Sequence, residues 1–276
     1  MATSASPHSE VADILVERVN LTALTQYAGK KIDGRQEELD AYIRRLVAEG
    51  VREGDYAAIP IQYYRNSRLG GRRYAKGLAA QKMTREARAA VFSDSAFDVD
   101  IANSTPSIML NLLRELSSLG NYPLLRKYCN HYRSWRAFTA EYSGIPEKDA
   151  KISIIKLFYG GLPDVELPFL WALGAEISRA TGVILGAEKF RYLQGHLRGR
   201  RNPMASRLSY ALAAGEDKIL MALRESVGRN MEGANISAFM FDGAVISTAA
   251  HRRDEIEALL NKVGAANHVT IEIKPF

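Results

Sequence analysis

The chain has 276 residues, of which 47% are apolar and 25% are charged. These values exclude a mainly disordered protein, because a chain of this length and composition can bury a sizeable core. Lys and Arg number 37 against 31 Asp and Glu, and the resulting formal charge of +6 favours a polyanionic partner. The single cysteine, Cys129, excludes an internal disulfide framework and a multi-cysteine zinc site, and it fits a reducing compartment.

The N-terminal part predicts a tail followed by a small helical cap. Residues 1–10 carry neither a basic nor an apolar signal region, so we expect a flexible tail and no secretion signal. Over residues 11–58 apolar positions recur at helical spacing in two runs, which predicts two helices. No stretch approaches eighteen consecutive apolar residues, so we expect a soluble protein without a membrane span, in the cytoplasm of its own cell or of a host cell.

A strand over residues 59–64 is expected to lead into a basic loop. The loop sequence RNSRLGGRRYAK holds five positive charges within twelve residues, beside Tyr74 and two glycines. Arginine binds phosphate through two parallel hydrogen bonds, and glycine lets a backbone approach nucleic acid closely. The loop therefore predicts a nucleic-acid contact, with a solvated surface loop as the alternative. Two further stretches, 126–136 and 189–201, combine basic and aromatic residues. Each could bind nucleic acid or form an exposed helix face.

Residues 97–101 alternate Phe, Asp, Val, Asp and Ile, which predicts a strand with Asp98 and Asp100 on one face. The Ser104-Thr105-Pro106 sequence that follows predicts the start of a helix. Two carboxylates on a buried face need a metal, a cationic partner or exposure at a strand end.

A second acidic position, Asp242, interrupts an otherwise apolar strand over residues 238–247. The next residue, Gly243, permits a close backbone approach or an unusual backbone angle. If the two strands pair antiparallel, three carboxylates gather, and oxygen ligands of this kind suit Mg²⁺ or Mn²⁺. Two such ions serve nucleotidyl transfer. The alternative is an ordinary Asp-Gly turn facing solvent.

A helix over residues 149–159 places Lys151, Ile155 and Tyr159 on one face. This face can receive a triphosphate, with Lys151 as phosphate contact and proton donor and Tyr159 against the base or sugar. The alternative is a solvated charge and a packing aromatic ring. Further helices are expected around 104–120, 124–142, 167–181, 186–197, 206–227 and 251–263, with a closing strand in HVTIEIKPF. Many helices around a few non-adjacent strands indicate the α+β class.

In this order, the motifs resemble the palm and fingers of family A DNA polymerases and the related single-subunit RNA polymerases, over about residues 60–276. Gly71 and Gln81 stand ten apart, as do Gly and Gln in that family, and Arg88 resembles the arginine that follows them. The strand with Asp100, the K-x7-Y-G pattern ending at Tyr159-Gly160, and Phe241-Asp242-Gly243 resemble the three later motifs.

The resemblance implies an α+β fold: a palm over residues 59–276 with a small antiparallel sheet and a helical fingers insertion at about 120–235. It implies a minimal template-directed DNA polymerase that uses two Mg²⁺ or Mn²⁺ ions, nucleoside triphosphates and a DNA or RNA primer-template. The implied catalytic residues are Asp100, Asp242 and Lys151, with Asp98 as an auxiliary metal ligand. The implied nucleotide contacts are Tyr159, Gly160, Arg72, Thr105 and Lys156. The implied nucleic-acid contacts are Gln81, Arg68, Arg73, Arg88, Arg200 and Arg201.

The chain departs from the family at several positions. An arginine is usual four residues before the motif lysine, where this chain has Glu147, and Lys148 or Lys156 would have to substitute. Family A DNA polymerases usually have a glutamate that limits the entry of ribonucleotides, and this chain has Thr105 at that position. The smaller side chain favours primase or RNA polymerase activity as an alternative. Few residues precede the palm for a thumb, so we expect a processivity partner that holds the template. Two alternatives are a non-catalytic nucleic-acid-binding protein and a template-independent nucleotidyltransferase. A viral or mobile-element origin is a further expectation.

Overall fold

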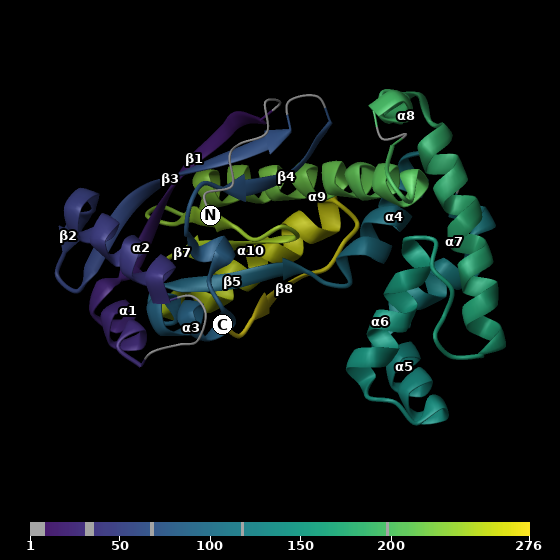
Figure 1. Cartoon of the computed structure of the whole chain (residues 1–276), viewed down its shortest axis with the longest axis horizontal. Helices are drawn as coiled ribbons and strands as arrows, with labels where there is room; N and C mark the ends of the chain where they lie inside the picture. The colour runs from purple at the N-terminus through teal and green to yellow at the C-terminus, as the bar shows by residue number, and fades with distance from the viewer. Residues whose placement is uncertain (1–8, 31–35, 67–68, 117–118, 197–198) are drawn as a thin grey trace. The chain divides into compact units, whose positions relative to one another are not determined.

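The computed structural model describes residues 9–30, 36–66, 69–116, 119–196 and 199–276 (Figure 1). The chain divides into two compact units, which we call the sheet unit (Met1–Ile101 with Asp217–Phe276) and the helical unit (Ala102–Glu216). The helical unit begins and ends earlier in the chain than the fingers insertion expected at about 120–235. Of the expected flexible tail, residues 1–8 lie outside the described residues, and Ser9 and Glu10 begin a strand.

The first sheet of the sheet unit is antiparallel, and its strand β3 pairs with the three others. Its strands are β1 (Ser9–Asn20), β2 (Val51–Glu53), β3 (Tyr56–Asn66) and β4 (Gly70–Ala75). The helix predicted for the first apolar run is therefore wrong. Alternate residues Leu15, Glu17 and Val19 are buried while Ile14 and Val16 are exposed, which is the two-residue period of a strand. Several of these positions are β-branched, and such residues favour strands over helices.

Three helices and one short turn accompany this sheet. They are α1 (Leu21–Ala28), α2 (Gln36–Glu49), the 3-10 turn η1 (Ala80–Lys82) and α3 (Arg85–Phe92). Helix α2 confirms the second helix predicted for the cap, since Leu39, Tyr42 and Leu46 are buried on one face. The predicted strand over residues 59–64 is also confirmed as part of β3, and the second half of the basic loop forms β4.

The second sheet of the sheet unit has the order β6-β7-β5-β8, and every neighbouring pair is antiparallel. Its strands are β5 (Ala96–Ile101), β6 (Asn235–Phe239), β7 (Gly243–Ser247) and β8 (Ile271–Lys274). A 3-10 turn, η4 (Ala250–Arg252), leads into helix α10 (Arg253–Ala266), which packs against β8 (Figure 1). The predicted antiparallel pairing of the two acidic strands is confirmed.

The helical unit is built around long helices with short connections (Figure 1). Its elements are α4 (Ser104–Glu115), η2 (Leu119–Asn121), α5 (Pro123–Ser143), α6 (Glu147–Phe158), α7 (Pro168–Gly186), η3 (Glu188–Phe190), α8 (Leu193–His196) and α9 (Pro203–Asn230), whose residues from 217 on belong to the sheet unit. Most expected helices are present. The helix expected at 186–197 is instead a 3-10 turn followed by the single turn of α8. Among the described residues, no helix combines the length and the apolar character needed to span a membrane.

Candidate active site

Strand β5 and the turn between β6 and β7 bring Asp100 and Asp242 together in the sheet unit. The backbone N–H of Ile101 donates to the carbonyl oxygen of Asp242 at 3.0 Å, and Asp100 lies opposite Gly243 in the strand register. A Cβ atom at Gly243 would lie 2.2 Å from the carbonyl oxygen of Val99. The glycine is therefore required by a close backbone approach, one of the two reasons that the sequence suggests for it.

The Asp100 side chain is half-buried, and one of its carboxyl oxygens is enclosed. Burial and the negative charge of Asp242 raise its pKa to about 8, while the nearby Lys274 acts in the opposite direction. Its Oδ1 atom is buried and has no hydrogen-bond partner among the described residues. Two carboxyl groups at such close range retain a proton unless a cation neutralises them.

Asp98, in contrast, is buried and has a partner. The guanidinium of Arg88 lies 3.6 Å from its carboxylate and also donates to the carbonyl oxygen of Met83 at 3.0 Å. Burial raises the pKa of Asp98, and the charge of Arg88 opposes that shift. Arg88 therefore acts within the protein, which does not fit the nucleic-acid contact predicted for it.

Asp100 and Asp242 supply some of the oxygen ligands that a hard divalent cation needs. Mg²⁺ is often held in enzymes by one or two carboxylates together with substrate phosphates, and Asp100 with Asp242 supplies such a pair. The unpartnered Oδ1 of Asp100 fits this use. Within the part of the chain that the structure describes, no group of three or more His, Cys, Asp or Glu side chains is arranged to hold a metal ion.

Two charged residues of β8 lie beside the aspartates, although the sequence analysis did not single them out. Glu272 stands opposite Asp100 and Lys274 opposite Asp98 in the strand register. The Nζ atom of Lys274 lies 2.7 Å from Oε2 of Glu272. The two-residue alternation of the closing strand could have identified them, because it places the side chains of Glu272 and Lys274 on one face.

Strand β4 places two side chains of the basic segment against the residue before Asp242. The guanidinium of Arg72 lies 5.6 Å from the centre of the Phe241 ring, and the Tyr74 ring meets the same ring edge-on at 5.7 Å. Phe241 has a φ of 63°, in the left-handed region that a non-glycine residue rarely adopts. Arg72 therefore lies near the Asp242 turn, whereas Arg68 lies outside the described residues.

Arg73 points into the protein. It is 8% exposed and forms ion pairs with Asp13, at 2.5 Å, and with Asp217. Its guanidinium also lies 5.3 Å from the centre of the Phe239 ring. These contacts tie β4 to β1 and to the C-terminal half of α9, and they do not fit the predicted nucleic-acid contact.

Gln81 is also buried, with 6% of its surface exposed. Its Oε1 atom accepts from the N–H of Ala75 at 2.9 Å. Its Nε2 atom donates to the carbonyl oxygens of Arg73 at 2.8 Å and Phe239 at 2.9 Å. Both amide hydrogens are thus used inside the protein, where they link β4 to β6, and this does not fit the predicted contact with nucleic acid.

In the helical unit, α6 presents the predicted groove wall. Lys151, Ile155 and Tyr159 line one groove of about 530 Å³, as the helical spacing predicts. The Tyr159 hydroxyl lies 3.3 Å from the hydroxyl of Thr105, which brings together two of the predicted nucleotide contacts. Gly160 follows Tyr159, the residue after α6, and its φ of 74° lies in the left-handed region.

The remaining predicted cations of this unit differ in their contacts. Lys156 holds both carboxylate oxygens of Asp164 at 2.6 Å, so its charge is already compensated. Arg200 lines a second groove of about 330 Å³ together with Tyr159. Arg201, the next residue, is exposed.

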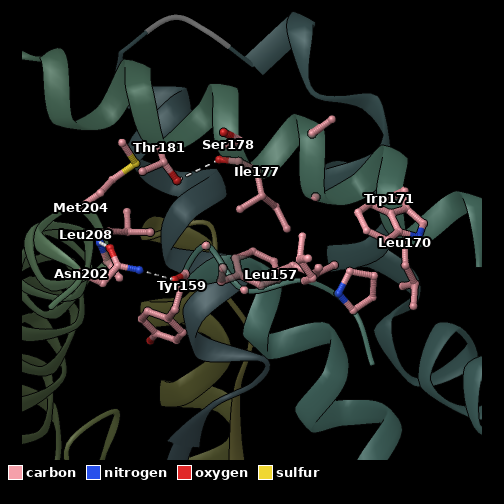
Figure 2. A pocket seen from close by; sticks show the side chains of 18 residues that line it. Leu157, Tyr159, Leu170, Trp171, Ile177, Ser178, Thr181, Asn202, Met204 and Leu208 are labelled. Carbon is pink, nitrogen blue, oxygen red and sulfur yellow. Dashed lines mark hydrogen bonds between the residues drawn. The ribbon is translucent and has the colours of Figure 1, made fainter. Parts of the chain in front are cut away.

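A third cavity, of about 550 Å³, lies between the end of α6, α7 and the start of α9. Figure 2 shows Trp171 on one side of it and Met204 and Leu208 on the other. The amide Nδ2 of Asn202 donates to the carbonyl oxygen of Tyr159 at 3.4 Å across its edge (Figure 2). Tyrosine is the only ionisable residue type in its lining, and no sequence pattern predicted this cavity.

Comparison with known proteins supports the fold. No protein-family model and no curated protein sequence matches the chain. Among solved structures, one match is the POL domain of Pol1 from M. smegmatis in complex with DNA primer-template and dNTP, with a TM-score of 0.53 and 12% sequence identity. The match covers 100% of this chain and 57% of the solved chain. The chain thus has a DNA-polymerase-like α+β fold.

Proposed function

We propose that the chain is a template-directed nucleotidyltransferase that extends a primer in the manner of a DNA polymerase. The observation that carries the proposal is the half-buried pair of Asp100, on β5, and Asp242, in the turn directly before the neighbouring antiparallel strand β7. The polymerase-like fold supports the same activity, and a partner that holds the template would complement it.

Asp100 and Asp242 are the proposed ligands of the divalent cations. Bound Mg²⁺ or Mn²⁺ would activate a 3′-hydroxyl and stabilise the leaving pyrophosphate. Between the two candidates on β5, Asp100 is preferred because the Asp98 carboxylate already has Arg88 as its partner. The role of Asp98 in this proposal is to hold Arg88 and the strand in place. The raised pKa of Asp100 implies that cation binding displaces a proton and strengthens with pH.

The groove of α6 is the proposed place of the nucleotide. Lys151 is exposed at the groove, where its ammonium group would contact the triphosphate and donate a proton to the departing pyrophosphate. Tyr159 would lie against the sugar or base. Arg72, Arg200 and Arg201 are the proposed contacts with the nucleic-acid backbone.

A primase or RNA polymerase activity is the second candidate, and Thr105 favours it. The Thr105 hydroxyl lies beside Tyr159, at the position where the related polymerases carry a larger glutamate. A smaller side chain leaves more room for a ribose 2′-hydroxyl. This candidate shares the chemistry of the first and differs in the sugar that it accepts.

Primer extension tests both candidates. The assay uses DNA and RNA templates, Mg²⁺ or Mn²⁺, and deoxynucleotides or ribonucleotides offered separately. Template-matched extension should be lost in Asp242→Asn and retained in Asp94→Asn, which removes an exposed carboxylate of the same unit. Extension that ignores the template would indicate a template-independent nucleotidyltransferase. Nucleic-acid binding by folded protein without any extension would indicate a non-catalytic binding protein.

A further inference from the structure

Arg136 of α5 is a buried cation without a counter-charge. It is 9% exposed, and no carboxylate of the described residues forms an ion pair with it. Its Nη2 atom donates to Oδ1 of Asn103 at 2.6 Å, and its guanidinium lies 4.7 Å from the centre of the Tyr132 ring. A neutral hydrogen bond and an aromatic ring do not neutralise a buried positive charge, which is unfavourable unless an anion approaches it.

Two buried polar atoms at this place lack hydrogen-bond partners among the described residues, namely Nε of Arg136 and Nδ2 of Asn103. The phenol of Tyr128 lies beside them, because burial raises its pKa while the positive charge of Arg136 and a side-chain hydrogen bond with it oppose the shift. We call Arg136, Asn103 and Tyr128 the donor cluster. Buried polar groups in native proteins are nearly always satisfied, so unsatisfied ones in one place indicate a ligand.

The orientation of Asn103 follows from its contact with Arg136. A guanidinium only donates hydrogen bonds, so the amide oxygen must face it and the NH₂ group remains available as a donor. Asn103 adopts a left-handed conformation, with φ 50° and ψ 48°, directly before α4. Asn103 is half-buried, so part of this residue reaches solvent at the turn while its Nδ2 atom is enclosed.

We propose that the donor cluster binds a phosphoryl anion, and that Arg136 is its phosphate contact. A phosphate offers several acceptor oxygens and negative charge, whereas the cluster offers donors and one positive charge. Lys156 is less suited to this task because Asp164 already compensates its charge. Assignment of the phosphate to a nucleoside triphosphate rests on the proposed function.

The test is calorimetric titration of the metal-free protein, in EDTA, with inorganic tripolyphosphate. Arg136→Met should weaken binding at least tenfold, and Arg136→Lys about threefold, because lysine keeps the charge and loses the planar fork. Arg133→Met is the matched control. Arg133 is on the same helix and also lies over the Tyr132 ring, at 5.6 Å, but it is exposed. Its loss should change the affinity less than twofold.

Asn103→Asp keeps the test decisive if Arg136→Met does not fold. A carboxylate beside Arg136 would neutralise the guanidinium within the protein and repel phosphate. We expect a folded variant, at least as stable as the wild type by thermal denaturation, with tripolyphosphate binding reduced more than tenfold. Unchanged binding in this variant, or equal losses in Arg136→Met and Arg133→Met, would overturn the proposal. Absence of binding by the wild type would also overturn it.

Two further experiments distinguish a triphosphate from a nucleic-acid phosphate, and the phosphate site from the proposed polymerase activity. A single-stranded oligonucleotide without a 5′-phosphate should compete with tripolyphosphate if the cluster binds a nucleic-acid backbone, and should not compete if it binds a triphosphate. The Asp242→Asn protein should bind tripolyphosphate as the wild type does. If primer extension fails in every condition while this binding still requires Arg136, the polymerase proposal fails and the phosphate site stands.

Discussion

The hydroxyl groups of Thr105 and Tyr159 lie 3.3 Å apart, which joins the first turn of α4 to the end of α6 within the helical unit. These residues are 54 positions apart in the sequence. Both were expected to contact a nucleotide, and residue 105 is the position that the resemblance to family A polymerases matches with a glutamate. Thr105 would leave more room for the sugar of an incoming nucleotide than a glutamate would.

Sugar selection should therefore depend on the size of residue 105. Thr105→Glu should lower kcat/KM for ribonucleotides relative to deoxynucleotides by about 10-fold or more, since a steric clash of this kind is worth more than about 1.4 kcal/mol. Single-nucleotide extension with matched NTP and dNTP pairs measures the ratio. Thr105→Val, which keeps the size and removes the hydroxyl, should leave the ratio within about 3-fold. An equal loss for both sugars in Thr105→Glu would show that residue 105 does not select the sugar.

Gly243 should tolerate no side chain. Gly243→Ala would place a methyl group 2.2 Å from the carbonyl oxygen of Val99, so β5 and β7 would have to separate. We expect a loss of roughly 3 kcal/mol or more in the free energy of unfolding, measured by urea denaturation. Gly228→Ala is the control, because a Cβ there meets no atom within 4 Å and alanine favours the helix by roughly 0.5–1 kcal/mol. A fully stable Gly243→Ala protein would contradict the close approach.

Gln81 should affect stability and not nucleic-acid binding. Gln81→Met leaves the backbone groups of Ala75, Arg73 and Phe239 without their partner, at a cost of about 2–4 kcal/mol. Binding of labelled primer-template at a temperature where the variant is folded should stay within about twofold of the wild type, which is below 0.5 kcal/mol. The half-buried Gln62, changed to Met, should cost less than about 1 kcal/mol. Wild-type stability with a large loss of binding would restore Gln81 as a direct contact.

The parts of the fold that the sequence predicts correctly are those with a local pattern. The two-residue alternation around Asp98 and Asp100 predicted β5, and the helical spacing of Lys151, Ile155 and Tyr159 predicted the groove wall of α6. In both cases the side chains that share a face are close in sequence, so the period alone decides which of them lie together.

The surroundings that the sequence does not reveal are those supplied by other segments of the chain. Nothing near Arg73 in the sequence reveals that Asp13 of β1 and Asp217 of α9 enclose it. Arg88 is likewise held by Asp98, although the resemblance implied a nucleic-acid contact for it. The helix predicted in place of β1 has a related cause, because its strand character depends on a long pairing with β3.

Glu17 should make the stability of the protein depend on pH. Its carboxylate is fully buried and accepts from Tyr42 at 2.8 Å, from Tyr63 at 3.4 Å and from the N–H of Ala80 at 3.1 Å. Burial raises its pKa from 4.5 to about 7, although these hydrogen bonds oppose the shift. The folded protein thus binds this proton more tightly than the unfolded chain. Its contribution to stability is complete below about pH 4.5 and declines as the pH rises to about 7.

Replacement of Glu17 by an uncharged isostere should remove this part of the pH dependence. Between pH 5 and pH 7.5, the free energy of unfolding of Glu17→Gln should decline less than that of the wild type, by on the order of 2 kcal/mol. Urea denaturation at half-unit pH intervals measures both profiles, and other titrating groups cancel in the difference. Glu53→Gln, at an exposed position, should follow the wild-type profile. Parallel profiles for Glu17→Gln and the wild type would mean that Glu17 stays ionised in the folded protein throughout this range, because its three donors outweigh its burial.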